Sequence, residues 1–168
     1  MLIDSLQFSR DRQSTRGTLP VAGFERLRVS LFAVAPVGDG GGGIRYEVTG
    51  GADARDRPLL RLKVAGRLAL QCQRCLKALD HELMIDTALR LAPEEALDAE
   101  MSDDPDEADC IAASMELDLL ALIEDEILLT LPAYPRHEDA DCGGSTETAG
   151  TKKDAAFSVL SKLGTLKQ

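Results

Sequence analysis

Apolar and polar residues alternate along two long stretches of this 168-residue chain. Across 59–72 the charged positions share one side of an extended segment, and the apolar ones share the other, namely Leu60, Leu62, Val64, Leu68, Leu70 and Cys72. Residues 80–91 repeat this alternation, with Leu83, Ile85, Thr87, Leu89 and Leu91 on one side. A period of two is typical of a strand with one buried face. The two stretches therefore predict a long β-hairpin, with Cys72 and Cys75 at or near its tip.

Two shorter segments, 27–35 and 44–49, also alternate and predict further strands, although helical spacing fits part of the first one as well. A helix is predicted over 118–131, because apolar residues recur there at helical spacing. Asp118 is a suitable N-cap for this helix, and Pro132 ends it. Its carboxylates Glu124, Asp125 and Glu126 are expected to face solvent.

These elements predict one α+β domain over residues 1–168. Its antiparallel sheet carries the hairpin with the Cys-x-x-Cys tip, one main helix packs on the sheet, and a short C-terminal helix follows. Residues 93–109 contain nine acidic residues and no basic one, so 93–110 is expected to be a mobile acidic loop. The polar segment 143–155 is expected to be a mobile linker before the last helix.

Charge is unevenly distributed along the chain, whose net charge is −10. Residues 1–92 hold 14 Lys and Arg against 10 Asp and Glu, whereas 93–168 hold 5 against 19. This asymmetry indicates two electrostatic surfaces, although acidity can also serve solubility alone. No apolar run approaches the roughly 20 residues that cross a bilayer, and the N-terminus lacks the pattern of a secretory signal. We therefore expect no membrane association and a cytoplasmic location, where thiols stay reduced.

The pair Cys72 and Cys75 has three interpretations: half of a zinc site, a redox pair, or thiols without chemistry. A structural zinc site needs four ligands, and the segment "HEDADC" offers His137 and Cys142 as the second pair. Cys110 is a competing fourth ligand, and His81 is the other histidine. A redox pair is expected at a helix N-terminus, which the predicted strands do not provide. The redox pair is therefore the least favoured of the three interpretations, and zinc and inert thiols are favoured over it.

Cationic residues concentrate in and beside the predicted hairpin. Alternation places Arg61, Lys63 and Arg67 on one strand face, and Arg74 and Lys77 follow near the tip. Arginine suits phosphate because its planar guanidinium makes paired hydrogen bonds. These five residues are a candidate RNA-binding surface, although an ordinary solvated strand face shows the same pattern. No aromatic residue interleaves with them, so contact with RNA backbone and shape is expected there rather than base stacking.

Four segments, in this order, resemble the YceD family, described as large ribosomal RNA subunit accumulation proteins: "GTLPVAGFERL", "LALQCQRCLKAL", "ELDLLALIEDEILLTLPAYPRHEDADC" and "AFSVLSKL". In the last segment Ala156 replaces the proline that is usual in the family. The resemblance implies a non-enzymatic role in accumulation of large-subunit ribosomal RNA, in ribosome assembly or RNA processing. The family motif also carries the His and Cys at 137 and 142, which favours zinc.

The resemblance implies that large-subunit ribosomal RNA, or its precursor, is the partner. Two other functions remain open from the residues themselves. One is a protein-interaction module for a basic ribosomal protein, which would use the acidic half of the chain. The other is a thiol- or zinc-dependent enzyme, although the chain shows no nucleophile, base and orienting group at recognisable positions.

Overall fold

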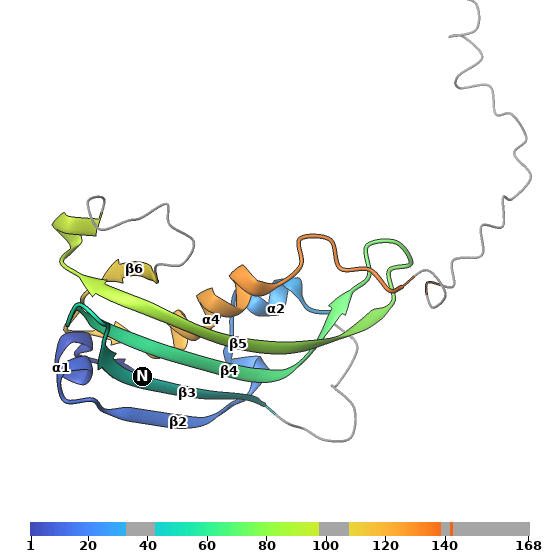
Figure 1. Cartoon of the computed structure of the whole chain (residues 1–168). Coiled ribbons are helices and arrows are strands. Elements are labelled where there is room, and N and C mark those ends of the chain that lie inside the picture. The colour runs from blue at the N-terminus through green and yellow to red at the C-terminus, as the bar shows by residue number, and fades with distance from the viewer. Residues whose placement is uncertain (33–42, 98–107, 139–141, 143–168) are drawn as a thin grey trace, which may run out of the picture.

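A computed structural model of the chain describes residues 1–32, 43–97, 108–138 and 142. At its centre is a five-stranded sheet with the strand order β2-β3-β4-β5-β6 (Figure 1). The strands are β2 (Ser14–Leu19), β3 (Ile44–Ala52), β4 (Pro58–Gln71), β5 (Ala78–Ala92) and β6 (Asp109–Ala112). Strands β2 to β5 pair antiparallel, whereas β6 pairs parallel with β5. Away from this sheet, β1 (Leu2–Ile3) pairs with β7 (Leu117–Asp118). The prediction of an α+β fold is confirmed, with a sheet that is mostly antiparallel.

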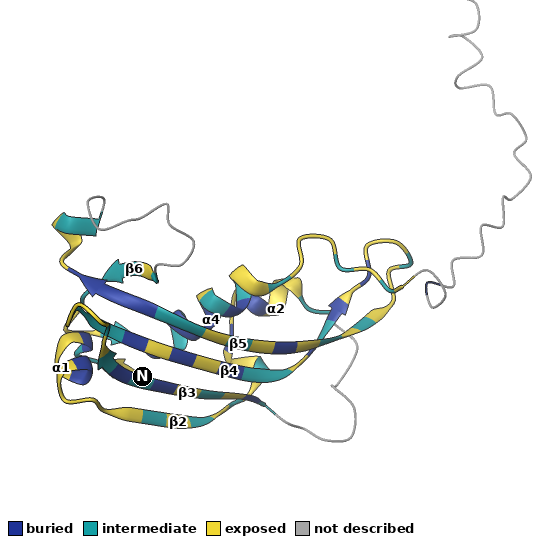
Figure 2. Ribbon diagram, viewed as in Figure 1, coloured by how far each residue is buried: buried dark blue, intermediate teal, exposed yellow. Residues whose placement is uncertain are grey.

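Strands β4 and β5 form the long hairpin that the alternating pattern predicts. Their register runs without interruption from Leu59 opposite Arg90 to Gln71 opposite Ala78. More and less buried positions alternate along β4 and along β5 as far as Thr87, whereas the last four residues of β5 are all buried (Figure 2). The apolar side of β4 faces the core, where Leu60 and Leu62 are fully buried. Opposite-facing side chains such as Arg61 are exposed, because successive residues of a strand point to opposite faces.

Three helices contribute to the core on the apolar side of the sheet. They are α1 (Ser5–Arg10), α2 (Leu27–Ser30) and α4 (Leu119–Thr130). Phe8, Leu27 and Ile123, one from each helix, belong to the same buried cluster as the apolar side chains of β3, β4 and β5. Asp118 caps α4 by accepting a hydrogen bond from the Leu120 N–H. The predicted helix and its N-cap are thus confirmed.

A glycine lets α1 lie directly against β3. A Cβ atom at Gly50 would come within 2.3 Å of the Phe8 carbonyl oxygen, which is far inside van der Waals contact. The Gly50 N–H also donates to the Gln13 carbonyl at 2.8 Å, and Ser9 donates its hydroxyl to the Gly51 carbonyl. The backbones of α1 and β3 therefore pack directly against each other, and this contact requires a residue without a side chain at position 50.

The prediction of a strand over 27–35 is wrong for residues 27–30, which form the helix α2 instead. Phe24 and Leu27 are both fully buried and lie three residues apart, whereas Val29 is 87% exposed. A helical turn satisfies this spacing, and an extended chain would have buried Val29 together with Leu27. Strand pairing resumes only at Leu31, which makes an isolated bridge to Leu70. Residues 33–42 are outside the described part of the chain.

The structure contains elements that the sequence analysis did not predict, and some predicted segments lie outside the described residues. The helix α1 and the strand β2 were not predicted, and neither was β6. Within the acidic segment 93–110, Glu94–Ala96 forms a 3₁₀ helix and Asp109 begins β6, while 98–107 lie outside the described residues. The linker 143–155 and the C-terminal helix also lie outside them. Among the helices of the described residues, none has the length and apolar character needed to cross a membrane.

Candidate metal centre

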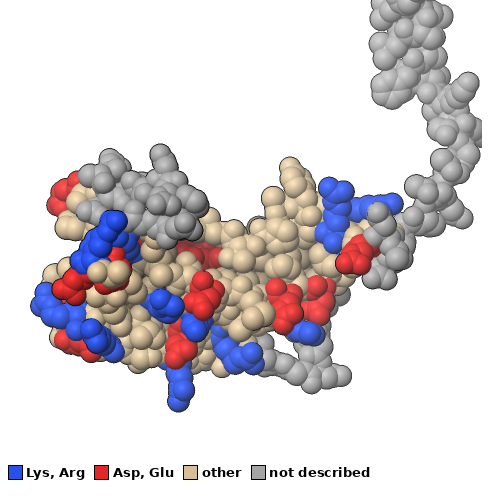
Figure 3. Space-filling view, in the orientation of Figure 1, with Lys and Arg blue, Asp and Glu red and all other residues tan. Residues whose placement is uncertain are grey.

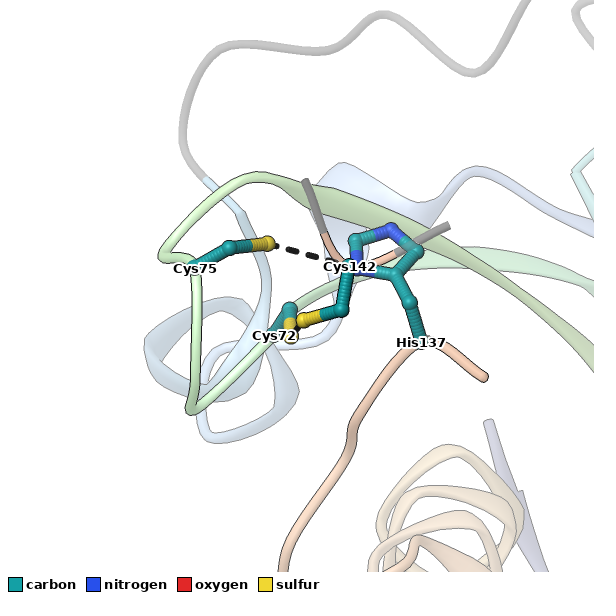
Figure 4. A group of neighbouring side chains, drawn as sticks. All are labelled: Cys72, Cys75, His137 and Cys142. Carbon is teal, nitrogen blue, oxygen red and sulfur yellow. Dashed lines mark hydrogen bonds between the residues drawn. The ribbon is translucent and has the colours of Figure 1, made fainter. Parts of the chain in front are cut away.

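The hairpin tip is a six-residue turn from Cys72 to Lys77, between the last residue of β4 and the first of β5. The Cys72 N–H donates to the Lys77 carbonyl at 3.0 Å, which closes the turn. Inside it, the Leu76 N–H donates to the Cys72 carbonyl at 2.9 Å. Leu76 has a φ of 58°, a left-handed conformation that tightens the turn. Both cysteine side chains then point to the same side of the tip (Figure 4).

The segment after α4 supplies the second half of the cluster. Pro132 stops the helix, and the chain then runs back to the hairpin tip (Figure 1). Backbone hydrogen bonding fixes this return, because the Gln73 N–H donates to the Pro135 carbonyl at 2.8 Å. His137 follows two residues later, and Cys142 is held near it by its N–H, which donates to the Glu138 carbonyl at 3.1 Å.

The side chains of Cys72, Cys75, His137 and Cys142 converge into one cluster (Figure 4). Their ligand atoms all lie within 4.8 Å of one another. The Sγ atoms of Cys72 and Cys142 are 3.7 Å apart, and the Cys75 Sγ is 3.4 Å from the His137 Nδ1. Around a tetrahedral zinc ion, two sulfur ligands are about 3.8 Å apart and a sulfur and an imidazole nitrogen about 3.6 Å. The four residues can therefore hold a metal ion with little movement.

The other nitrogen of His137 fixes how the ring presents itself to the cluster. Nε2 lies 2.9 Å from the Ala78 carbonyl oxygen, to which it donates. In the neutral imidazole, Nδ1 then carries the lone pair and faces the sulfur atoms. A ligating histidine usually donates its second nitrogen in this way, since the bond fixes the tautomer and the ring orientation. The ring is therefore arranged as a metal ligand would be.

Electrostatics in the cluster favour a bound cation. Burial raises the pKa of the Cys72 thiol, but hydrogen bonds from the backbone of Cys75, His137 and Arg74 outweigh it and lower that pKa to about 5. Burial, together with the neighbouring Cys72 and Cys75, raises the pKa of Cys142 to about 11. The hydrogen bond to Cys72 raises the pKa of His137. One thiolate is thus favoured and a second is opposed, a conflict that a divalent cation removes.

The remaining candidate ligands lie elsewhere in the fold. Cys110 is in β6, opposite Arg90 of β5, and His81 is in β5, opposite Leu68 of β4. Neither residue belongs to the cluster. The redox interpretation gains nothing from the local structure, because Cys72 follows a strand and no helix begins at the cysteines. All four cysteines are free thiols.

The predicted RNA-binding residues fall into two places. Arg61, Lys63 and Arg67 are exposed on the outward face of β4, whereas Arg74 and Lys77 are exposed in the tip turn. Acidic residues of β5 accompany the first group, since Lys63 lies 3.5 Å from Asp86 and Arg67 lies 3.3 Å from Asp80. The view in Figure 3 shows basic and acidic side chains interspersed over the strands. The sheet face is therefore of mixed charge rather than uniformly basic.

One of the carboxylates expected to face solvent is buried. Glu124 of α4 is only 6% exposed, so that expectation is wrong for this residue. Its Oε1 accepts hydrogen bonds from the Arg26 and Leu27 N–H groups at 2.8 and 3.0 Å, and its Oε2 accepts from the Arg26 Nε at 3.1 Å. Asp125 does lie at the surface, where it also pairs with Arg26. Glu124 thus joins α4 to the start of α2.

Fold and cluster together define a small α+β protein whose hairpin tip and post-helix segment share a Cys₃His site. The sequence model of the family "Large ribosomal RNA subunit accumulation protein YceD" matches residues 60–164, which include the hairpin, α4 and all four cluster residues. The chain belongs to the YceD family. No solved structure matches it. The family name implies involvement in the accumulation of large-subunit ribosomal RNA.

Proposed function

We propose that this protein is a non-enzymatic factor that supports accumulation of large-subunit ribosomal RNA, during ribosome assembly in the cytoplasm or processing of the RNA precursor. Membership of the YceD family carries the proposal. The shape of the Cys₃His cluster supports the non-enzymatic part. Catalytic zinc sites keep a coordination position for water or substrate, whereas four protein ligands fill a tetrahedral site.

Zinc is the metal that this ligand set fits best. Three thiolates and one imidazole suit a tetrahedral ion of intermediate softness, and the Cys72–Cys142 and Cys75–His137 distances agree with zinc geometry. When bound, the ion would join the hairpin tip to the segment that follows α4. It would thereby reinforce the hydrogen bonds that already join the two segments, from the Gln73 N–H to the Pro135 carbonyl and from the His137 Nε2 to the Ala78 carbonyl.

Direct contact with the RNA would use the cationic residues of the hairpin. Arg61, Lys63 and Arg67 on the sheet face, with Arg74 and Lys77 at the tip, can neutralise phosphates. Such contacts position a protein on RNA and carry little sequence information. The net charge of −10 makes a local basic surface necessary, since the chain as a whole repels RNA.

The cellular test removes the gene and measures the ratio of large- to small-subunit ribosomal RNA. Loss of the protein should lower this ratio, and the wild-type chain should restore it. Cys72→Ser should restore it poorly if the metal cluster is needed, whereas Cys110→Ser, which changes a thiol outside the cluster, should restore it fully. An unchanged ratio in the deletion strain would refute the proposed function.

A binding test measures affinity for large-subunit ribosomal RNA across a range of salt concentrations. Replacing Arg61, Lys63 and Arg67 together by glutamine should reduce the salt slope by about one unit for each phosphate that the variant no longer neutralises. The acidic half of the chain favours a second candidate, a module that binds a basic ribosomal protein. Salt-sensitive binding to ribosomal proteins with none to RNA would establish that candidate instead.

A further inference from the structure

The hairpin tip exposes apolar and aromatic surface that the core does not use. Tyr134, in the segment that returns from α4, is 75% exposed, and Leu76, in the tip turn, is 60% exposed. The two lie in segments joined by the hydrogen bond from the Gln73 N–H to the carbonyl of Pro135, the residue after Tyr134. Tyr134 is the one exposed aromatic side chain among the described residues. The metal cluster beneath would hold both segments in position.

Cationic residues neighbour Leu76 and Tyr134 in the two segments. Arg74 and Lys77 are exposed in the turn, and Arg136 is exposed between Pro135 and His137. Glu138 is the acidic residue next in the return segment, so the described part of the tip is net cationic. Figure 3 shows a group of Lys and Arg side chains at that end of the molecule, with acidic ones beside them, and further basic side chains over the strands and toward the opposite end. On the outward sheet face, Lys63 and Arg67 pair with acidic residues of β5.

The backbone of the turn presents Leu76 outward under strain. Its φ of 58° is a conformation that glycine or asparagine adopts more readily than leucine. The same conformation closes the turn that brings Cys72 and Cys75 to one side, and most of the Leu76 side chain is exposed there. The turn therefore presents an apolar side chain to solvent at the hairpin tip.

We propose that the hairpin tip binds an unpaired segment of RNA, with one base stacked on Tyr134 and the adjacent phosphates held by Arg74, Lys77 and Arg136. This inference rests on the proposed function and names the surface and the RNA form it uses. Proteins that bind single-stranded nucleic acid combine exposed aromatic rings with nearby cations, and the two segments at the tip offer both. Paired bases are hidden in a duplex, so an aromatic ring gains no stacking contact there. Leu76 supplies an apolar edge beside the stacked base.

The composition of the chain permits a direct optical test. There is no tryptophan, and the only tyrosines are Tyr46 and Tyr134, so Tyr46→Phe leaves Tyr134 as the single emitter. The zinc-loaded full-length Tyr46→Phe protein is titrated with an unstructured mixed-sequence oligoribonucleotide and, separately, with a duplex of the same length. Stacking should quench tyrosine emission with the single strand and leave it unchanged with the duplex.

Affinity measurements on variants separate stacking from charge. Tyr134→Ala should weaken binding of the single strand by about 5- to 100-fold, and Tyr134→Phe should restore most of it, because the ring carries the contact. Met115→Ala is the matched control, since Met115 is 80% exposed but lies before β7, outside both the hairpin and the segment that returns from α4. It should leave binding unchanged. Arg136→Gln should lower the salt slope by about one unit.

The outcomes distinguish this inference from the proposed function. Binding of large-subunit RNA that Tyr134→Ala leaves unchanged would overturn the tip as the stacking surface and leave the proposed function standing. Equal quenching by duplex and single strand would also overturn it. No binding to any RNA, with capture of a ribosomal protein that depends on Tyr134, would overturn both direct RNA contact and this inference, and would identify the tip as a protein-binding surface.

Discussion

Replacing Glu124 by alanine tests the contact that joins α4 to α2. In the folded chain, one carboxylate oxygen accepts the backbone N–H groups of Arg26 and Leu27, and the other accepts the Arg26 Nε. Alanine removes both acceptor oxygens and with them all three hydrogen bonds. The side chain is 6% exposed, so water does not readily replace it at the Leu27 N–H, which lies in a buried environment.

The expected loss follows from the two backbone donors. Each buried donor left without an acceptor costs about 1–3 kcal/mol. Arg26 is better placed to reach water, so Glu124→Ala should lower the free energy of unfolding by about 3 kcal/mol. With a urea m-value of about 2 kcal/mol/M, this loss moves the unfolding midpoint by about 1.5 M. Equilibrium urea denaturation followed by circular dichroism measures the shift.

Asp125 provides a matched control on the same helix. It is also a carboxylate that pairs with Arg26, but its side chain is 51% exposed. Exposed ion pairs contribute about 0–1 kcal/mol, so Asp125→Ala should change the unfolding free energy by less than about 1 kcal/mol. Equal losses in the two variants would refute the reasoning, because charge rather than the buried hydrogen bonds would then explain both.

The same contact predicts an acid-dependent loss of stability. Burial raises the pKa of Glu124, but the backbone bonds from Leu27 and Arg26, with the Arg26 side chain, outweigh it and hold the pKa below its ordinary value of 4.5. The folded state therefore binds the proton more weakly than the unfolded state, and the contribution is complete above about pH 4.5. It is lost as pH falls through the lower, folded pKa. Glu124→Gln should flatten this part of the profile of stability against pH, and an unchanged profile would contradict the assignment.

Two further predictions concern the metal and the packing of α1. Protein purified without added zinc should contain about one metal ion per chain by elemental analysis, lost in His137→Ala but kept in His81→Ala, which changes the histidine outside the cluster. The unfolding free energy of the wild-type protein should be about 3 kcal/mol higher with free zinc at a hundred times its dissociation constant than with EDTA, which removes the zinc. Equal stability in the two conditions would show that the site holds no metal. Gly50→Ala should lower the thermal midpoint by several degrees, because its Cβ would lie 2.3 Å from the Phe8 carbonyl oxygen. Gly51→Ala, whose Cβ would have no neighbour closer than 4.0 Å, should lower it far less.

Local pattern was sufficient to predict the hairpin and the main helix. The alternation from Leu60 to Leu70 determines which face of β4 is buried, because a shift by one residue would place every apolar side chain in water. Asp118 and Pro132 mark the ends of α4 through short-range backbone chemistry. Signals of this kind need no distant partner, so they can be interpreted from the chain itself.

The candidate metal site was only partly predictable. The two-residue gap between Cys72 and Cys75 suits a metal-binding turn, and the resemblance to a family pointed to His137 and Cys142. Their meeting depends on the length of α4 and on the bond from Gln73 to Pro135, neither of which a ligand pattern specifies. The contact of Cys75 with His137 spans 62 residues of sequence. Only the folded chain shows that the four ligand atoms come together.

The sequence by itself determined the hairpin, its buried face, the boundaries of α4 and the types of the four candidate ligands, because short-range periodicity, capping and spacing control these features. Tertiary structure alone decided that residues 27–30 form a helix, that β6 pairs parallel to β5, and that Glu124 lies inside the protein. Each of these depends on a partner distant in sequence. Glu124 satisfies N–H groups 97 and 98 residues away, and nothing around it in the chain distinguishes it from the exposed Asp125. Where contacts between residues distant in sequence supply the free energy of folding, they override the local helix or strand propensity of the residues involved.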